Sequence, residues 1–167
     1  GDIVSIKALK VIGPINGKDI AVLRMLGGRE EEDADEVALA HMTYLDLYDA
    51  TICTDPNNIC FNRDGINDYV ENDNEIPEHM FWKLDKLQTV VLPKNVTKID
   101  DNAFYDCLNI ETIVVGDETT EIGNDAFGKC KSLKNLVFLC NDKRIILKCK
   151  LFLKNHKATV LFHELYC

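Results

Sequence analysis

Two cysteines in the middle of the chain lie in similar sequences, and a cysteine near acidic residues can do chemistry. The segments are DDNAFYDC at residues 100–107 and GNDAFGKC at residues 123–130. A catalytic cysteine needs a neighbouring base and a depressed pKa, because the thiolate is the nucleophile. The pairs that residue type alone allows are Cys60 with His41 or His79, and Cys149 with His156. Nothing in their spacing supports such a pair, so we predict no catalytic residue.

Residue types that bind metal ions are present, but their spacing is not that of a metal site. The seven cysteines include no CxxC pair, and the four histidines share no ligand spacing. A calcium loop can be placed on CFNRDGINDYVE, residues 60–71, with Gly65 as its sixth position. Its first position is then Cys60, where Ca²⁺ requires an oxygen ligand. We predict no metal site and no cofactor, and we expect most cysteines to be buried free thiols that pack as small apolar groups.

Composition and charge exclude some classes of partner. The 167 residues are 46% hydrophobic and 28% charged, which is enough to bury a core. A net charge of −9 opposes nucleic acid, because phosphate binding needs a broad basic face. Residues 129–157 nevertheless carry nine Lys or Arg and one acid, so this basic end is either a solvated rim or a patch for an acidic partner or for head-to-tail stacking. No apolar run approaches the roughly 18 residues of a membrane span.

A 23-residue repeat is the strongest pattern in the chain. Residues 87–107 align with residues 110–130. Two columns continue on this period, an isoleucine column at 76, 99, 122 and 145 and a phenylalanine column at 81, 104 and 127. The phrase L-x-x-L-x-L predicts a short strand, and stacking such strands about 4.8 Å apart forms one continuous core. The recurring Ala-Phe-x-x-Cys is then predicted on the opposite wall, as a short helical turn begun at Asp100 or Asp101 that points Phe104 and Cys107 inward.

The first half shows the same strand phrase without the fixed period. IKALKV at 6–11 and MTYLDL at 42–47 are predicted strands, and NGKDIAVLRMLGG at 16–28 is a predicted helix. We expect Asp19 to start this helix and Gly27-Gly28 to end it. The polar, turn-rich residues 53–75 are predicted as a loop. The C-terminal residues 158–167 resemble a last, degenerate strand and cap.

The repeats resemble a known family. LPKNVTKIDDNAFYDCLNIETIVV and TTEIGNDAFGKCKSLKNLVF are similar to the BspA-type leucine-rich repeat. The N-terminal module of such proteins from gut and oral Bacteroidetes is resembled by LKVIGPINGKDIAVLRMLGGR, MTYLDLYDATI and NDNEIPEHMFWKLDKLQTVVLP. The resemblance implies an α/β leucine-rich repeat solenoid, right-handed, with short parallel strands on the concave face and short helical or irregular turns on the convex face. We expect one domain over 1–167, with an irregular N-terminal module at 1–63, regular repeats at 64–145 and a degenerate cap at 146–167.

The resemblance also implies a function. Such proteins are secreted or anchored at the outer membrane, often by a lipid on the processed precursor, and we expect the signal sequence to be absent from this chain. The expected role is non-enzymatic adhesion to protein or glycoprotein of the host matrix or of bacterial surfaces, by a monomer or a weakly self-associating chain. The alternatives are a structural, self-associating surface module and, less favoured, a thiol-dependent enzyme.

The predicted binding residues are the outward positions of the strand phrase. Thr89, Thr112 and Asn135 form one column, and Val91, Val114 and Val137 form a second that Leu161 extends. A row of exposed valines is typical of a contact surface, although β-branched residues also simply suit stacked strands.

Overall fold

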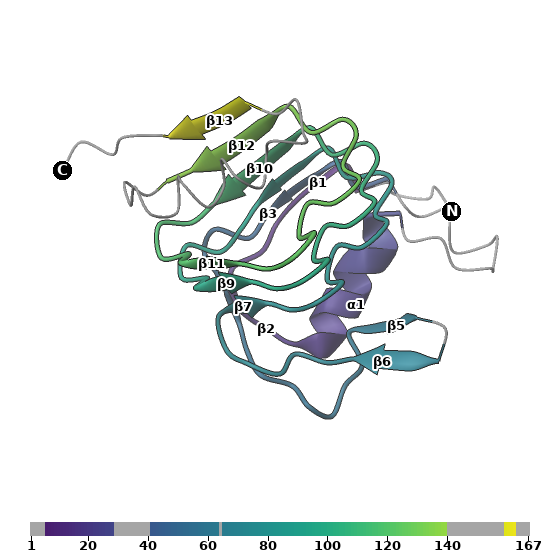
Figure 1. Cartoon of the computed structure of the whole chain (residues 1–167). Coiled ribbons are helices and arrows are strands. Elements are labelled where there is room, and N and C mark those ends of the chain that lie inside the picture. Colours follow the sequence, from purple (N-terminus) through teal and green to yellow (C-terminus); the bar gives the residue numbers. More distant parts are fainter. Residues whose placement is uncertain (1–5, 29–40, 64, 140–158, 163–167) are drawn as a thin grey trace.

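The computed structural model describes residues 6–28, 41–63, 65–139 and 159–162. In these residues the chain winds in successive coils, each with a strand on one side and a turn on the other (Figure 1). The fold is therefore a repeat solenoid built on parallel strands, while its right-handed winding stays a prediction.

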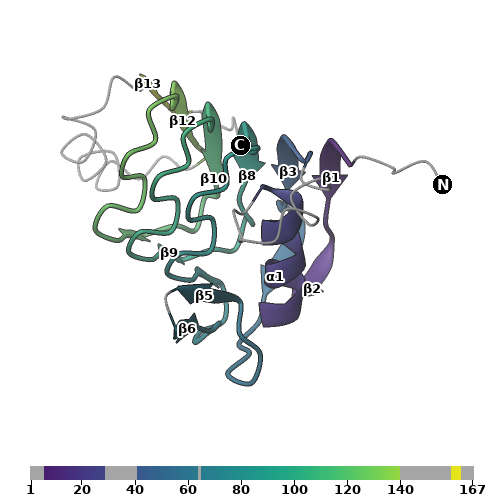
Figure 2. The ribbon, with the colours of Figure 1, turned by 90° about the vertical axis from the view of Figure 1, so that its right-hand side faces the viewer.

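The largest sheet contains six parallel strands that lie side by side along one side of the molecule (Figure 2). In spatial order they are β1 (Ala8–Lys10), β3 (Tyr44–Asp46), β8 (Thr89–Val91), β10 (Thr112–Val115), β12 (Asn135–Phe138) and β13 (Thr159–Phe162). Ile113 pairs with Val90 on one side and Leu136 on the other, so one step across the sheet is one 23-residue repeat. The last strand forms where the sequence predicts it.

Alternation along each strand separates the core from the surface. Val90, Ile113 and Leu136 are buried, whereas the residues on either side of each are half-buried and point outward. A second parallel sheet of three short strands lies across the coils, in the order β11 (Glu121–Ile122), β9 (Lys98–Ile99) and β7 (Glu75–Ile76). It carries the isoleucine column, of which Ile76 and Ile99 are fully buried.

Turns, and not helices, connect these two sheets in each described coil. Every turn has two residues with positive φ, four positions apart and repeated every 23 residues: His79 and Lys83, Asn102 and Asp106, Asp125 and Lys129. An α-helix cannot contain such left-handed residues, so the short helical turn predicted at Asp100 or Asp101 is wrong and this wall is irregular.

The turns nevertheless point the predicted residues inward. Phe81, Phe104 and Phe127 stack from coil to coil, with ring centroids 4.5 and 5.6 Å apart. The Cys107 thiol donates to the carbonyl of Phe81 at 2.7 Å, and Cys130 donates to that of Phe104 at 3.0 Å. Each recurring cysteine is thus a buried group that bonds to the preceding coil, as the sequence predicts.

Helix α1 (Gly17–Leu26) packs beside the first coils. Asn16, and not Asp19, caps it: the Asn16 side chain accepts from the Lys18 amide, and the Asp19 carboxylate accepts from the Asn16 amide. Gly27 ends the helix, followed by Gly28 at φ +92°, as predicted. At 10 residues α1 is too short to cross a membrane, and no other described helix could do so.

Residues 53–75 contain more structure than the predicted loop. β5 (Phe61–Arg63) and β6 (Ile66–Asp68) form an antiparallel hairpin, closed by a turn in which Gly65 has φ +83°. The remaining two-stranded sheet pairs β2 (Gly13–Ile15) with β4 (Ala50–Ile52) in parallel. Sequence reasoning missed the hairpin because its strands are short and polar, although its turn chemistry was present.

Truncating the stacked ring at Phe104 tests how much the wall of turns contributes to stability. Phe104→Ala removes a fully buried ring together with its contacts to the rings of Phe81 and Phe127. We therefore expect the free energy of unfolding in urea to fall by about 3–5 kcal/mol. Leu108→Ala in the same turn, where Leu108 is 41% exposed, should change it by no more than about 0.5 kcal/mol. Equal losses in the two variants would contradict a packed wall.

Candidate functional site

The outward side chains of the six-stranded sheet form two rows, which together we name the strand face. One row crosses the strands through Ala8, Tyr44, Thr89, Thr112, Asn135 and Thr159. The other crosses them through Lys10, Asp46, Val91, Val114 and Val137. Because parallel strands keep a one-to-one register, each row brings together side chains from separate coils.

The structure brings together all six residues predicted for binding. Val91, Val114 and Val137 occupy directly paired positions, and the backbone of Leu161 on β13 pairs with Val137. Thr89, Thr112 and Asn135 do the same in the other row, where the Asn135 amide donates to the Thr112 hydroxyl at 3.3 Å. All six are half-buried, so each keeps part of its surface open to solvent. Their placement agrees with the prediction, and whether they bind a partner stays a prediction.

The N-terminal part of the strand face is polar and charged. Lys10 lies 2.9 Å from Asp49 and 3.8 Å from Asp46, and Lys94 lies 3.6 Å from Asp49. The hydrogen bond with Asp49 raises the pKa of Lys10, and the same bond lowers the pKa of Asp49. The strand face therefore changes from an ion-pair cluster at one end to an apolar row in the middle.

Tyr44 and Asp46 belong to this surface and were not among the predicted residues. Tyr44 is 40% exposed and pairs with Thr89, while Asp46 pairs with Val91. The signal was present, since both are outward positions of the strand phrase MTYLDL. It was missed because this phrase lies outside the 23-residue period.

The arrangement of the strand face suits contact and not catalysis. A β-branched apolar row beside a row of hydroxyls and one amide offers dispersion contacts and hydrogen bonds to an extended or flat partner. Among its described side chains there is no cysteine or histidine that could act as a nucleophile or base. The acidic segment 29–36 and most of the basic end at 129–157 lie outside the described residues, so their predicted roles are untested.

The buried cysteines are poor nucleophiles. Burial raises the pKa of Cys60 to about 11, and its thiol donates to the Asp68 carbonyl at 3.2 Å. Burial also raises the pKa of Cys107 well above its ordinary value. A raised pKa is the opposite of what a catalytic thiolate requires. Of the cysteine and histidine pairs considered from residue type, Cys149 with His156 lies outside the described residues.

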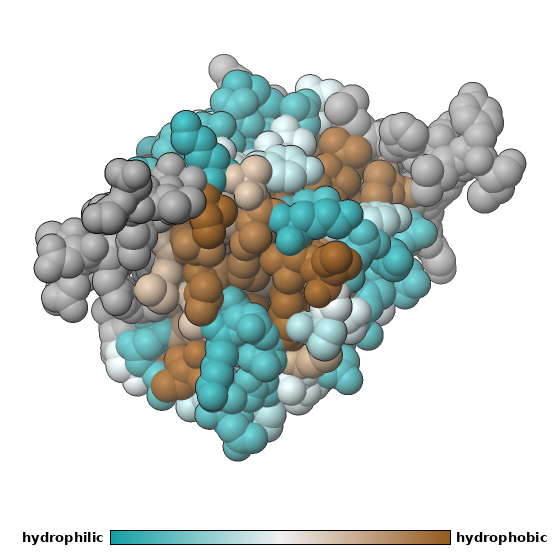
Figure 3. Space-filling view, turned by 180° about the vertical axis from the view of Figure 1, so that it is seen from behind, coloured by the Kyte–Doolittle hydropathy of each residue, from teal (hydrophilic) through white to brown (hydrophobic). Residues whose placement is uncertain are grey.

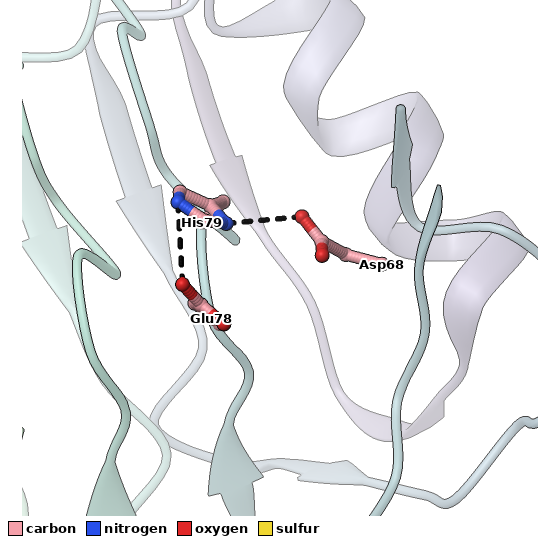
Figure 4. A group of neighbouring side chains, drawn as sticks. All are labelled: Asp68, Glu78 and His79. Atoms are coloured by element: carbon pink, nitrogen blue, oxygen red, sulfur yellow. Dashed lines mark hydrogen bonds and ion pairs between the residues drawn. The ribbon is translucent and has the colours of Figure 1, made fainter. Parts of the chain in front are cut away.

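A cluster of His79, Asp68 and Glu78 lies at the first turn of the array (Figure 4). The His79 ring is buried, with Nδ1 3.0 Å from Asp68 Oδ2 and Nε2 3.4 Å from Glu78 Oε1. Asp68 comes from β6, whereas Glu78 and His79 follow β7. Sequence reasoning missed the cluster because Asp68 reaches the turn only through the unpredicted hairpin.

The calcium loop considered for residues 60–71 does not form. Its central residues lie in the two antiparallel strands of the hairpin, and Asn62 and Asn67 bond to each other across it. The side chains of these opposed strands therefore do not converge on one point in the way a calcium loop requires.

Comparison with known proteins agrees with the repeat pattern. The model of the BspA type leucine rich repeat region matches residues 57–156 in six copies. No curated protein matches the chain.

The buried thiols predict low reactivity in the folded protein. In a background where Cys53, Cys140, Cys149 and Cys167 are replaced by serine, we expect the remaining Cys60, Cys107 and Cys130 to react with a thiol reagent at pH 8 only after unfolding. Stability should also fall as pH rises from about 9 to about 11. In this window the unfolded chain loses its Cys60 proton near the ordinary value of 9.0, while the folded chain keeps it to about 11. A fast-reacting thiol among the three would revive the enzyme alternative.

Proposed function

Because this chain belongs to the BspA-type leucine-rich repeat family, we propose that it is a non-enzymatic interaction module that binds a protein or glycoprotein partner through the strand face. The setting we propose is the bacterial exterior, where the chain is secreted or anchored at the outer membrane and takes part in adhesion. The family supports the general role, since leucine-rich repeats are interaction modules. The binding mode rests on this chain's own residues.

The observation that carries the proposal is the in-register row of Val91, Val114 and Val137. The core is already filled by the buried residues between them, among them Ile113 and Leu136. The outward valines therefore add little that the fold requires, and they keep apolar surface in contact with water. An apolar row of this kind, beside hydrogen-bonding side chains, is typical of a protein contact surface.

Ion pairs at the N-terminal part of the strand face support a protein partner over a lipid surface. Lys10, Asp46, Asp49 and Lys94 mix both signs of charge within a few ångströms. Mixed charge of this kind helps to select a partner of complementary pattern and not one of uniform charge. We expect this end to set orientation and the valine row to supply most of the affinity.

Charging the centre of the valine row tests the binding mode. We expect Val114→Asp to weaken capture of a partner from host matrix or bacterial surface extracts by at least about tenfold, while the midpoint of thermal unfolding changes little. Val114→Thr, which keeps the branched shape, should weaken capture less.

A matched control lies on the opposite wall, where Leu108 is 41% exposed. Leu108→Asp introduces the same charge away from the strand face and should leave capture unchanged. If Val114→Asp unfolds the chain, Val114 is part of the core. If Leu108→Asp weakens capture equally, the strand face is not the contact surface.

Self-association is a second candidate function, favoured by an apolar surface at the N-terminal end of the array. Figure 3 shows this surface over β1, β2 and α1, bordered by hydrophilic residues. Its exposed members are Ile6, Ile12, Val22 and Met25, of which Ile12 is 71% exposed. The edge strand β1 also lies here, with one side of its backbone outside the sheet. An edge strand with apolar neighbours is a common site of pairing between chains.

Light scattering against protein concentration separates the two candidates. A self-associating chain should show a mass that rises with concentration, and Ile12→Lys should abolish the rise. Ile66→Lys, on the hairpin where Ile66 is 57% exposed, is the matched control and should not. A constant monomer mass would exclude self-association and leave heterotypic binding.

A further inference from the structure

His79 is a buried imidazole whose two ring nitrogens each face a carboxylate. His79 is 1% exposed. Its Nδ1 lies 3.0 Å from Asp68 Oδ2, and its Nε2 lies 3.4 Å from Glu78 Oε1. Figure 4 shows the ring between the two carboxylates, which approach it from different sides. Neither the strand face nor the repeat pattern requires this arrangement.

A neutral histidine ring has too few protons to donate to both carboxylates. A neutral imidazole has one N–H and one lone pair. The 3.0 Å contact is a normal hydrogen-bond length, so the single proton belongs on Nδ1, where it is donated to Asp68. The lone pair of Nε2 then faces the Glu78 carboxylate, and two acceptors repel each other unless a positive charge lies between them. The buried nitrogen therefore points to a cation or a second proton.

The spacing of these two atoms fits a metal ion. Zinc binds imidazole nitrogen at about 2.0–2.1 Å and carboxylate oxygen at about 2.0–2.2 Å, and tetrahedral angles then place the two donors about 3.4 Å apart. The observed separation of Nε2 and Glu78 Oε1 is 3.4 Å. A charge-assisted hydrogen bond between the same groups is usually shorter, at about 2.7–2.9 Å. The geometry is thus that of two ligands of one ion.

The hydrogen bond on the other side of the ring has a role that metal sites commonly use. A metal-bound histidine usually donates its second ring N–H to a carboxylate, which orients the ring and raises its basicity. Asp68 is in that position. The Asn102 amide also lies 3.5 Å from Glu78 Oε1, a long contact that an ion would outcompete.

Both the main chain and the ring of His79 are fixed by neighbouring side chains. The buried guanidinium of Arg24 donates to the carbonyls of His79 and Met80, each at 2.7 Å. The ring also packs edge-on against Trp82 and tilted against Phe61, with centroids 6.2 and 6.0 Å away. A ligand fixed in this way loses little conformational entropy when an ion binds.

The surface next to Glu78 can admit an ion and complete its shell. A hollow of about 100 Å³ opens there, and its lining includes the carboxylates of Asp68, Glu71, Glu75, Glu78 and Asp100. Their shared negative charge raises the local concentration of cations, and water or a neighbouring carboxylate can supply further ligands. The buried imidazole distinguishes this place from an ordinary acidic surface.

We propose that His79 Nε2 and Glu78 bind a divalent transition-metal ion of the zinc class, with Asp68 as the residue that orients the imidazole. Imidazole with carboxylate ligands favours zinc-like ions over Ca²⁺ or Mg²⁺, which take oxygen ligands. The ion would bind within the first turn, and the hydrogen bond from His79 to Asp68 would connect it to the hairpin. It would therefore stabilise the junction between the N-terminal module and the repeats.

The proposal is tested by titrating the full chain with Zn²⁺ in a calorimeter and by measuring its thermal unfolding at several Zn²⁺ concentrations. We expect one site that raises the unfolding midpoint in proportion to the logarithm of free Zn²⁺ above its dissociation constant. His79→Asn should abolish this site. Asparagine is compatible with the fold there, because Asn102 occupies the same positive-φ position one coil later.

Three carboxylate variants distinguish a metal ligand from a residue that orients the histidine and from one that only adds negative charge nearby. Glu78→Gln, at a side chain that is 47% exposed, should abolish the site without disturbing the core. Asp68→Asn should weaken Zn²⁺ about 10–100-fold, as expected for an orienting residue. Glu71→Gln removes one charge from the same hollow and should leave the affinity within about twofold of the parent.

Four results would overturn the proposal. Zn²⁺ binding that survives His79→Asn would place the ion elsewhere in the chain. An equal loss in Glu71→Gln and Glu78→Gln would mean diffuse attraction to the hollow, and Ca²⁺ binding as tight as Zn²⁺ would mean an oxygen-only site. Absence of any Zn²⁺ effect would mean that a doubly protonated His79 joins the two carboxylates.

Discussion

Hydrogen bonds between neighbouring coils are the constraint on which the rest of this structure depends. Much of the main chain of each coil is covered by the coils on either side of it and cannot bond to water. Its buried amides and carbonyls must therefore bond to the coil before or after it. The Phe104 amide donates to the Ala126 carbonyl at 2.7 Å, and the Gly123 amide donates to that of Ile99 at the same distance. Such bonds form only if successive coils have the same length, because a slip of one residue would turn buried side chains outward. The 23-residue period is the result of this requirement.

The first coil has no regular coil before it, and its exposed carbonyls are satisfied in a different way. Arg24 reaches from α1 and donates to the carbonyls of His79, Met80 and Trp82, while its guanidinium lies 3.9 Å from the Phe61 ring centre. In the next coil, the corresponding carbonyls of Ala103 and Tyr105 accept from main-chain amides of the coil before, those of Phe81 and Lys83. The helix therefore does for the start of the array what each coil does for the next. This explains why a charged side chain is buried at this place.

The same constraint separates the residues that can carry function from those that cannot. Inward residues such as Ile113 and Phe104 are fixed by stacking, and a change there alters every neighbouring contact. Outward residues such as Val114 are free to vary, so a partner can be selected there without cost to the fold. The first turn is a further exception. His79 occupies the position that Asn102 and Asp125 hold in regular turns, and it is the place where the irregular hairpin meets the array.

The sequence by itself determined the repeat, the register of β8, β10 and β12, the inward Phe and Cys residues and the middle of the strand face, because all of these follow from a period that can be read along the chain. It did not determine the turn conformation, since two left-handed residues per coil replace the helical turn that Asp100 and Asp101 suggested. Nor did it show the hairpin, the buried Arg24 or the cluster of Asp68, Glu78 and His79. The hairpin was missed because its strands are short and polar, while the other two depend on contacts between segments 11–58 residues apart that share no period. Only the tertiary structure could decide them, because non-periodic contacts leave no regular pattern of residue types in the chain.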